Sequence, residues 1–211
     1  MRLYSYWRSS ASWRVRIGLK LKGLDVDLIP VDLRDGEQHG AIHRARNALG
    51  QVPVLEVEQG GQRRQLTQSL AILQWLESVH PDPPLLPQDP WACARAWQMA
   101  EVINAGTQPL QNLNTQRRVA ALTATDGRLW CKEFINRGLT ALEGMAAEDP
   151  QLFLAGQHPS VADCCLVPQL YNARRFSCDT KAWPHLMAIE ARAMALDAFI
   201  QSHPDRQPDA H

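Results

Sequence analysis

Short apolar segments with turn residues between them predict strands in the first third of the chain. Residues 2–6 and 26–33 fit strands, and Pro30 favours a sheet edge for the second because proline cannot donate to a central ladder. Residues 52–58 alternate, imperfectly, between apolar and acidic side chains. The Gln-Gly-Gly-Gln sequence at 59–62 then predicts a hairpin turn into another strand.

Helical periodicity begins at Ser69, which we expect to be an N-cap. The apolar residues that recur at helical spacing after it are Ile72, Leu73, Leu76 and Val79. Between residues 14 and 22 the apolar residues fall at every second position, and this pattern taken alone predicts a strand. A helix that is buried on most sides would tolerate the same pattern.

The best domain boundary is the segment 80–89, which contains four prolines and no periodic pattern. Asp89 then supplies an N-cap with Pro90 at the first helical position, and mostly helical patterns follow. Ser160 and Asp163 have the spacing of a capping box before an apolar run.

These boundaries predict an α+β domain over 1–80, a linker over 81–89 and an all-α domain over 90–211. The polar residues 203–211 predict a frayed tail at the end of the second domain.

Composition and charge narrow the classes of partner. Lysine and arginine together number 22, as do aspartate and glutamate, so the formal net charge is zero. We therefore expect neither nucleic acid nor an anionic membrane to be the main partner. No apolar run approaches the roughly 20 residues of a membrane span, and no segment resembles a signal peptide. The five cysteines lack CxxC or zinc-site spacing, which predicts reduced thiols, a cytoplasmic location and no bound metal.

One strand-to-helix turn brings together residues that could stabilise an anion. Arg8, Ser9, Ser10 and Ser12 follow the first predicted strand, and a helix N-terminus offers unpaired N–H groups and a partial positive charge. Such a site favours an anion, including a thiolate. The simpler interpretation, that these serines only cap a helix, is favoured while the turn is considered alone.

Other polar sequences have the same two interpretations. Gln68 and Ser69 stand at a helix start, where they could hold a carboxylate or merely cap the helix. Arg174 and Arg175 end a helix, where they could clamp a carboxylate or complement the helix dipole. The polar run from Gln108 to Asn114 could bind a ligand or form a solvated face.

The order of these motifs resembles the zeta-class glutathione transferases. The residues SSASWRVRI at 9–17 match the SSxSxRVRI signature of that class. Further matches, in order, are QVP at 51–53, QSLAI at 68–72, LLPQDP at 85–90, QPLQNL at 108–113, LVPQ at 166–169 and NARRF at 172–176. The resemblance covers nearly the whole chain. It implies a thioredoxin-like N-terminal domain in which residues 14–22 form a helix, an all-α C-terminal domain, a homodimer and glutathione as the cofactor.

The resemblance also implies roles for individual residues. Ser9 falls at the catalytic serine with Ser10 beside it, and Arg8 and Arg175 would bind the carboxylates of a dicarboxylate substrate. The residues that would contact glutathione are Ser9, Ser10, His39, Gln51, Val52, Gln68, Ser69, Gln108, Gln111 and Asn112. A cis peptide is expected between Val52 and Pro53. Ala11 replaces the usual cysteine of the motif, and His39 falls where the family has a glutamine.

Several activities are compatible with this family. The first is isomerisation of maleylacetoacetate to fumarylacetoacetate, and isomerisation of maleylpyruvate is a close second. General transfer of glutathione or dehalogenation of small α-halo acids is a third, and a non-catalytic binding module is a fourth. The presence of Ser9, Gln68, Ser69 and both arginines argues against the fourth.

Overall fold

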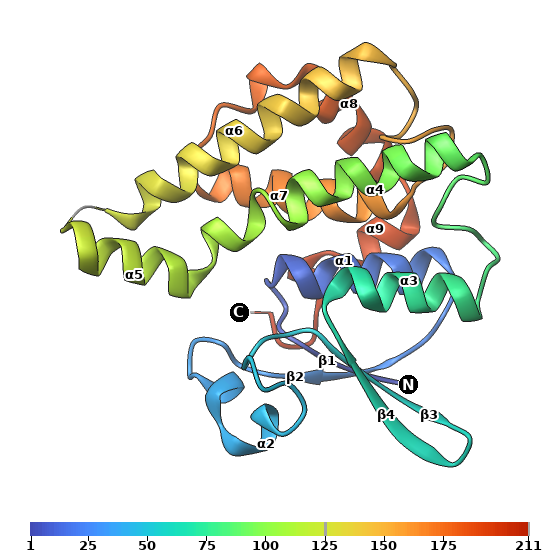
Figure 1. Ribbon diagram of the computed structural model, residues 1–211, viewed down its shortest axis with the longest axis vertical. Coiled ribbons are helices and arrows are strands. Elements are labelled where there is room, and N and C mark those ends of the chain that lie inside the picture. Colours follow the sequence, from blue (N-terminus) through green and yellow to red (C-terminus); the bar gives the residue numbers. More distant parts are fainter. Residues whose placement is uncertain (125, 211) are drawn as a thin grey trace. The chain divides into compact units, whose positions relative to one another are not determined.

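The computed structural model describes residues 1–124 and 126–210. The chain packs as two compact units (Figure 1). One unit comprises Met1–Leu85 together with the chain from Leu196 onward, and the other comprises Leu86–Ala195. The predicted linker falls at the boundary between them, and the predicted combination of an α+β unit and an all-α unit is confirmed.

The first unit is built on a mixed four-stranded sheet with strand order β2-β1-β3-β4. Its strands are β1 (Arg2–Ser5), β2 (Asp27–Pro30), β3 (Val54–Gln59) and β4 (Gln62–Thr67). β1 pairs in parallel with β2 and antiparallel with β3, and β3 and β4 form the predicted hairpin. Pro30 lies on an edge strand as predicted, and Gly60 and Gly61 take the positive φ angles, 60° and 71°, that the tight turn needs.

Helices α1 (Ser10–Leu21) and α3 (Ser69–Val79) pack side by side against the sheet, and α9 (Asp197–Ser202) contacts α1 (Figure 1). α1 is a helix in spite of its alternating pattern, because side chains all around it from Ser12 to Leu19 are buried. Gly18 permits this packing, since a Cβ atom there would overlap the Leu73 side chain of α3.

The predicted start of α3 is wrong by one residue. The N-cap is Gln68, with φ at 69°, and Ser69 is the first residue of the helix. The left-handed backbone at Gln68 turns the chain sharply from β4 into α3.

The second unit is helical in all the elements that the described residues form, apart from one isolated bridge. Its α-helices are α4 (Pro90–Asn104), α5 (Leu113–Thr123), α6 (Gly127–Glu148), α7 (Val161–Arg175) and α8 (Pro184–Ala193). α7 is buried along most of its length and contacts α4, α6 and α8. The predicted cap of α4 is confirmed, because the Ala92 N–H donates to Asp89 Oδ2 at 2.7 Å.

Shorter helical elements lie between these helices and strands along the chain. They are the one-turn helix α2 (Ala41–Arg44) and the 3-10 turns Glu37–His39, Gln108–Gln111, Thr180–Ala182 and Pro204–Arg206. Among the described residues, none of the helices has both the length and the apolar composition that crossing a membrane requires.

The prediction of a frayed tail is wrong for residues 203–210. Pro204 and Gln207 are buried, and the side-chain amide of Gln207 donates to two backbone carbonyl groups. Asp209 accepts the backbone N–H of Trp7 at 2.9 Å. Residues from Leu196 onward therefore belong to the first unit, whereas the sequence pattern assigned them to the helical domain.

The predicted capping box at the start of α7 is present and fully buried. Asp163 accepts hydrogen bonds from the backbone N–H groups of Leu154 and Ser160 and from the Ser160 hydroxyl, at 2.8–2.9 Å. Burial nevertheless raises the pKa of the Asp163 carboxyl from 3.8 to about 6, and these hydrogen bonds oppose the rise.

Because the folded-state pKa of Asp163 lies above the unfolded value, the folded chain binds the extra proton as the pH falls from 7 to 5. Through this group alone, the free energy of unfolding should rise by about 1 kcal/mol over that interval. We expect Asp163→Asn to lose this increment as well as a hydrogen bond. Urea denaturation of the parent and of Asp163→Asn at pH 7, 6 and 5 measures the free energy of unfolding. An equal difference between the two proteins at every pH would contradict the raised pKa of Asp163.

Candidate active site

The register of the sheet brings three of the predicted site segments to one end of the first unit. Tyr4 of β1 pairs with Val54 of β3, and Val54 pairs with Thr67 of β4. Since both pairs are antiparallel, the end of β1, the start of β3 and the end of β4 lie together. The segments that adjoin these three points are 6–10, 51–53 and 68–69.

The first segment is the turn between β1 and α1. The Ser9 N–H donates to the Tyr6 carbonyl oxygen at 3.0 Å and closes the turn. Ser9 is the N-cap of α1, and its Oγ accepts the Ser12 N–H at 3.2 Å. The Arg8 guanidinium lies 5.0 Å from the centre of the Trp7 ring, at cation–π distance.

The cap and the predicted catalytic role of Ser9 are compatible. A serine hydroxyl has one hydrogen to donate and two acceptor lone pairs, and the cap uses an acceptor. The Ser9 O–H can therefore donate to an anion in front of α1, where the helix dipole adds a partial positive charge. Ser10 is the first residue of the helix and is buried.

The second segment precedes β3. The Val52–Pro53 peptide is cis, as the family resemblance implies, and Val52 is buried. The carbonyl oxygen of Gln51 accepts from His43 Nε2 and Asn47 Nδ2, both at 2.9 Å, which fixes the loop. His39 is exposed and lies beside this loop: a Cβ atom on Gly50 would be 3.1 Å from His39 Nδ1.

The third segment is the start of α3. Gln68 is exposed, whereas Ser69 is buried and its Oγ accepts from Arg14 Nη1 at 3.3 Å. Arg14 projects from α1 and is itself buried. This contact joins the two helices whose N-termini lie at this end of the sheet, so two partial positive charges and several N–H donors adjoin one another.

Three of the residues predicted to contact glutathione, Gln108, Gln111 and Asn112, belong to the helical unit. Gln108 Nε2 donates to Asn112 Oδ1 at 2.6 Å. The amides of Gln111 and Gln169 form a reciprocal pair, with hydrogen bonds of 2.9 and 3.0 Å, and both side chains are buried. In this arrangement the Gln111 side chain fixes η2, the 3-10 turn at 108–111, to α7.

The two arginines at the end of α7 differ in their surroundings. Arg174 forms an ion pair with Glu190 of α8, and this contact raises the pKa of Arg174. Arg175 Nη1 donates to Asn172 Oδ1 at 3.1 Å, and its side chain is exposed. Arg174 thus fits the structural interpretation of a helix-end cation, whereas Arg175 remains the arginine that the family resemblance implies for binding a carboxylate.

Sequence reasoning gave no role to two buried arginines of α1. Arg14 contacts Ser69, and Arg16 donates to the backbone of the turn that precedes Ser9. A signal was present, since both arginines alternate with Val15 and Ile17 in a segment that is otherwise apolar. Among the described residues, no group of three or more histidine, cysteine or acidic side chains could hold a metal ion.

Comparison with known proteins agrees with the fold. Residues 1–78 match the model of the glutathione S-transferase N-terminal domain, and residues 133–192 match that of the C-terminal domain. These two matches define the class of protein as a glutathione S-transferase.

Individual relatives show to which group of glutathione S-transferases the chain is similar. The maleylacetoacetate isomerase of Rhizobium meliloti is 44% identical over 97% of this chain and 96% of its own length. A glutathione-bound crystal structure of maleylacetoacetate isomerase from Anaeromyxobacter dehalogenans is 51% identical, with a TM-score of 0.93 over 100% of this chain and 97% of that one. The zeta-class maleyl pyruvate isomerase, solved in its holo form, is 35% identical with a TM-score of 0.94 over the whole of both chains. The chain belongs to the zeta-class maleylacetoacetate isomerase family.

We predict that Ser9→Ala lowers turnover far more than Ser10→Ala. Loss of a hydrogen bond to a charged sulfur costs about 1.5–3 kcal/mol, or on the order of tenfold to a hundredfold in rate. Ser9→Gly separates catalysis from capping, because glycine at an N-cap costs only a few tenths of a kcal/mol in stability. Turnover is measured for each variant, and the pKa of the bound glutathione thiol is measured by ultraviolet titration. A thiol pKa in Ser9→Ala equal to that of the parent would refute the hydrogen bond from Ser9 to the thiolate.

Proposed function

We propose that the chain is a glutathione-dependent cis–trans isomerase that converts maleylacetoacetate to fumarylacetoacetate. The observation that carries the proposal is the convergence of the Ser9 hydroxyl, the Val52 segment and two helix N-termini at one end of the sheet. The identities of 51% and 44% to isomerases of this name support the choice of substrate.

The donor groups at this end of the sheet fit the tripeptide glutathione. The N-terminus of α3, with Gln68 and Ser69, suits the γ-glutamyl carboxylate. Val52, next to a cis proline at the start of β3, suits the extended backbone of the cysteinyl residue. The N-terminus of α1 and the Ser9 hydroxyl suit the thiolate. We infer supporting contacts from Gln51, His39, Gln108, Gln111 and Asn112, as the family resemblance implies.

Isomerisation requires that a conjugated double bond lose its π character for long enough to rotate. Bound glutathione supplies a thiolate that adds reversibly to the double bond, which lets the carbon–carbon bond rotate before the thiolate leaves again. The Ser9 O–H and the dipole of α1 stabilise the thiolate form and so lower the pKa of the thiol. Arg8 and Arg175 bind the substrate carboxylates, and Arg8 also faces the negative charge that develops on the substrate oxygen.

A crystal structure of the Anaeromyxobacter dehalogenans isomerase contains dicarboxyethyl glutathione and citrate in its active site. Dicarboxyethyl glutathione is a thioether between glutathione and a four-carbon dicarboxylate. A pocket of the same kind in this chain would accommodate a thiol joined to a dianionic substrate, as the proposed reaction requires.

Maleylpyruvate is the second candidate substrate, because the holo maleyl pyruvate isomerase has the same fold over the whole chain. We expect glutathione-dependent isomerisation of maleylacetone, as a maleylacetoacetate analogue, with higher kcat/KM than that of maleylpyruvate. The reverse ranking would transfer the proposal to maleylpyruvate. Turnover of dichloroacetate without isomerisation of either compound would favour the dehalogenating alternative, and failure to bind glutathione would exclude all three.

Variants of Arg8 and Arg175 test, in the same maleylacetone assay, whether these residues bind the substrate. Arg175→Lys should raise KM for maleylacetone on the order of tenfold, because lysine cannot reproduce the bidentate clamp on a carboxylate. Arg8 substitution should lower kcat more than it raises KM. Glutathione affinity, measured by calorimetry, should change little in either. Arg174→Lys is the matched control, since its Glu190 ion pair is structural. An unchanged KM in Arg175→Lys would make Arg175 a helix-end cation only.

We also propose a homodimer, on the ground of the family resemblance and a net charge of zero that does not oppose self-association. Sedimentation at micromolar concentration should give about twice the chain mass of 23.7 kDa. A single species at the chain mass would contradict it.

A cytoplasmic location completes the proposal. It is supported by the thiols of Cys131 and Cys178, which are buried and not joined in disulfides, a cysteine usage that is common in reducing compartments. For both groups burial raises the pKa, which keeps the thiols protonated and unreactive. Recovery of the protein in a secreted or periplasmic fraction of its own cells would overturn it.

A further inference from the structure

The backbone of Trp7, two residues before Ser9, is held on both sides by side chains from outside its own turn. Its N–H donates to Asp209 Oδ2 at 2.9 Å, and its carbonyl oxygen accepts from Arg16 Nη2 at 2.8 Å. The two contacts engage the two successive peptide groups on either side of the Trp7 Cα atom, within the segment 6–9. Asp209 reaches it from the end of the chain, 202 positions away.

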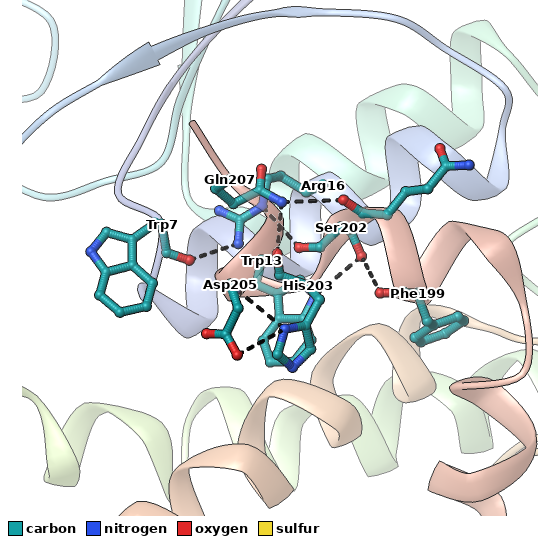
Figure 2. A network of polar contacts seen from close by, with 9 residues as sticks. Trp7, Trp13, Arg16, Phe199, Ser202, His203, Asp205 and Gln207 are labelled. Carbon is teal, nitrogen blue, oxygen red and sulfur yellow. Dashed lines mark hydrogen bonds and ion pairs between the residues drawn. The ribbon is translucent and has the colours of Figure 1, made fainter. Parts of the chain in front are cut away.

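Arg16 links this turn to the C-terminal segment (Figure 2). Its Nη1 donates to Ser5 Oγ at 3.0 Å, and its Nε donates to the carbonyl oxygen of Ser202 at 3.2 Å. Trp13, one turn of α1 away, donates from its ring nitrogen to Ser202 Oγ at 3.1 Å. α1, the turn and Ser202 at the end of α9 therefore share one polar network.

The C-terminal segment is itself fixed, so that it can act as a support. The side-chain amide of Gln207 donates to the carbonyl oxygens of Gln201 and His203, at 3.2 and 2.8 Å (Figure 2). Ala210, directly after Asp209, packs on a buried cluster that includes Trp7 and Val52. Asp209 thus lies in the chain between two residues whose positions are fixed, Gln207 and Ala210.

We propose that Asp209 is a positioning residue for the reaction: its carboxylate, held by the C-terminal segment, fixes the Tyr6–Ser9 turn and thereby the place of the Ser9 hydroxyl. The catalytic part of this inference rests on the proposed function, and the structural part does not. The closing contact of the turn, from the Ser9 N–H to the Tyr6 carbonyl oxygen, transmits the position of Trp7 to Ser9.

Charge and position predict opposite effects of Asp209 on a thiol bound at Ser9. A carboxylate disfavours a second anion in its vicinity, so removal of its charge alone would lower the pKa of the bound thiol. Loss of the support displaces the Ser9 hydroxyl from the thiolate and raises the same pKa. The direction of the change therefore distinguishes a positioning residue from an electrostatic one.

The test compares Asp209→Ala and Asp209→Asn with the matched control Asp205→Ala. Asp205 lies on the same segment, is exposed, and contacts His203 instead of the turn. Three quantities are measured on the full chain: amide hydrogen exchange of the peptide that contains residues 6–12, the pKa of bound glutathione thiol by ultraviolet titration, and kcat on maleylacetone.

In Asp209→Ala we expect faster exchange in that peptide, a thiol pKa raised by about one unit, and kcat lowered about tenfold with KM nearly unchanged. Asp209→Asn loses the charge but keeps an acceptor oxygen, so exchange and kcat should change by less, and the thiol pKa should lie below that of Asp209→Ala. Asp205→Ala should match the parent. The proposal is overturned if Asp209→Ala exchanges like Asp205→Ala, or if its thiol pKa falls.

The experiment still decides the proposal if Asp209→Ala fails to fold or if the parent lacks isomerase activity. If Asp209→Ala does not fold, Asp209→Asn must still show faster exchange, and parental exchange in that variant would overturn the proposal. If the parent fails to isomerise maleylacetone, the proposed function fails by itself, and exchange in the 6–12 peptide still decides whether Asp209 supports the turn.

Discussion

The buried guanidinium of Arg16 organises the first unit. Removal of an arginine from water is costly, and burial lowers the pKa of Arg16 to about 9, with the charge of Asp209 opposing this effect. The group remains charged at neutral pH and donates to a serine hydroxyl and to three backbone carbonyl oxygens. A lysine ammonium has three N–H donors and could not satisfy all four of these acceptors, whereas a guanidinium has five.

This arrangement explains why a strand-to-helix turn can hold the Ser9 side chain in a fixed place. Turns have fewer backbone partners than strands or helices, and their positions are correspondingly less well determined. Here the turn before Ser9 is bonded within itself, to α1 through Arg16 and to the C-terminal segment through Asp209. The sheet register then places the Val52 and Ser69 segments next to a loop that is already fixed.

The parts of the fold that depend on local chemistry could be predicted from the sequence. The hairpin at Gly60 and Gly61, the cap at Asp89 and the capping box at Ser160 all follow from residues within a few positions of one another. α1 could not be predicted from its pattern, because burial on nearly every side erases the helical period. Its assignment came from the family resemblance.

The site was predictable to a similar degree, for the same reason. Ser9 and Ser69 stand at helix starts that the sequence marks, although the cap of α3 is Gln68. The support from the tail could not be predicted, because the partner of Asp209 lies 202 positions away and no local pattern records it. Polar residues near a terminus are usually solvated, which made the tail of this chain look frayed.

The order of synthesis acquires a particular meaning in a chain whose first unit consists of two stretches that are far apart in the sequence. Domains usually fold from the N-terminus as the ribosome releases them. Here the helical unit, 86–195, is inserted between the two parts of the other unit in chain order. Arg16 emerges early but meets Ser202 and Asp209 only after the helical unit has been synthesised. The turn before Ser9 therefore lacks part of its support until the chain has grown past residue 209, and a shorter, ribosome-bound chain lacks the groups that hold it.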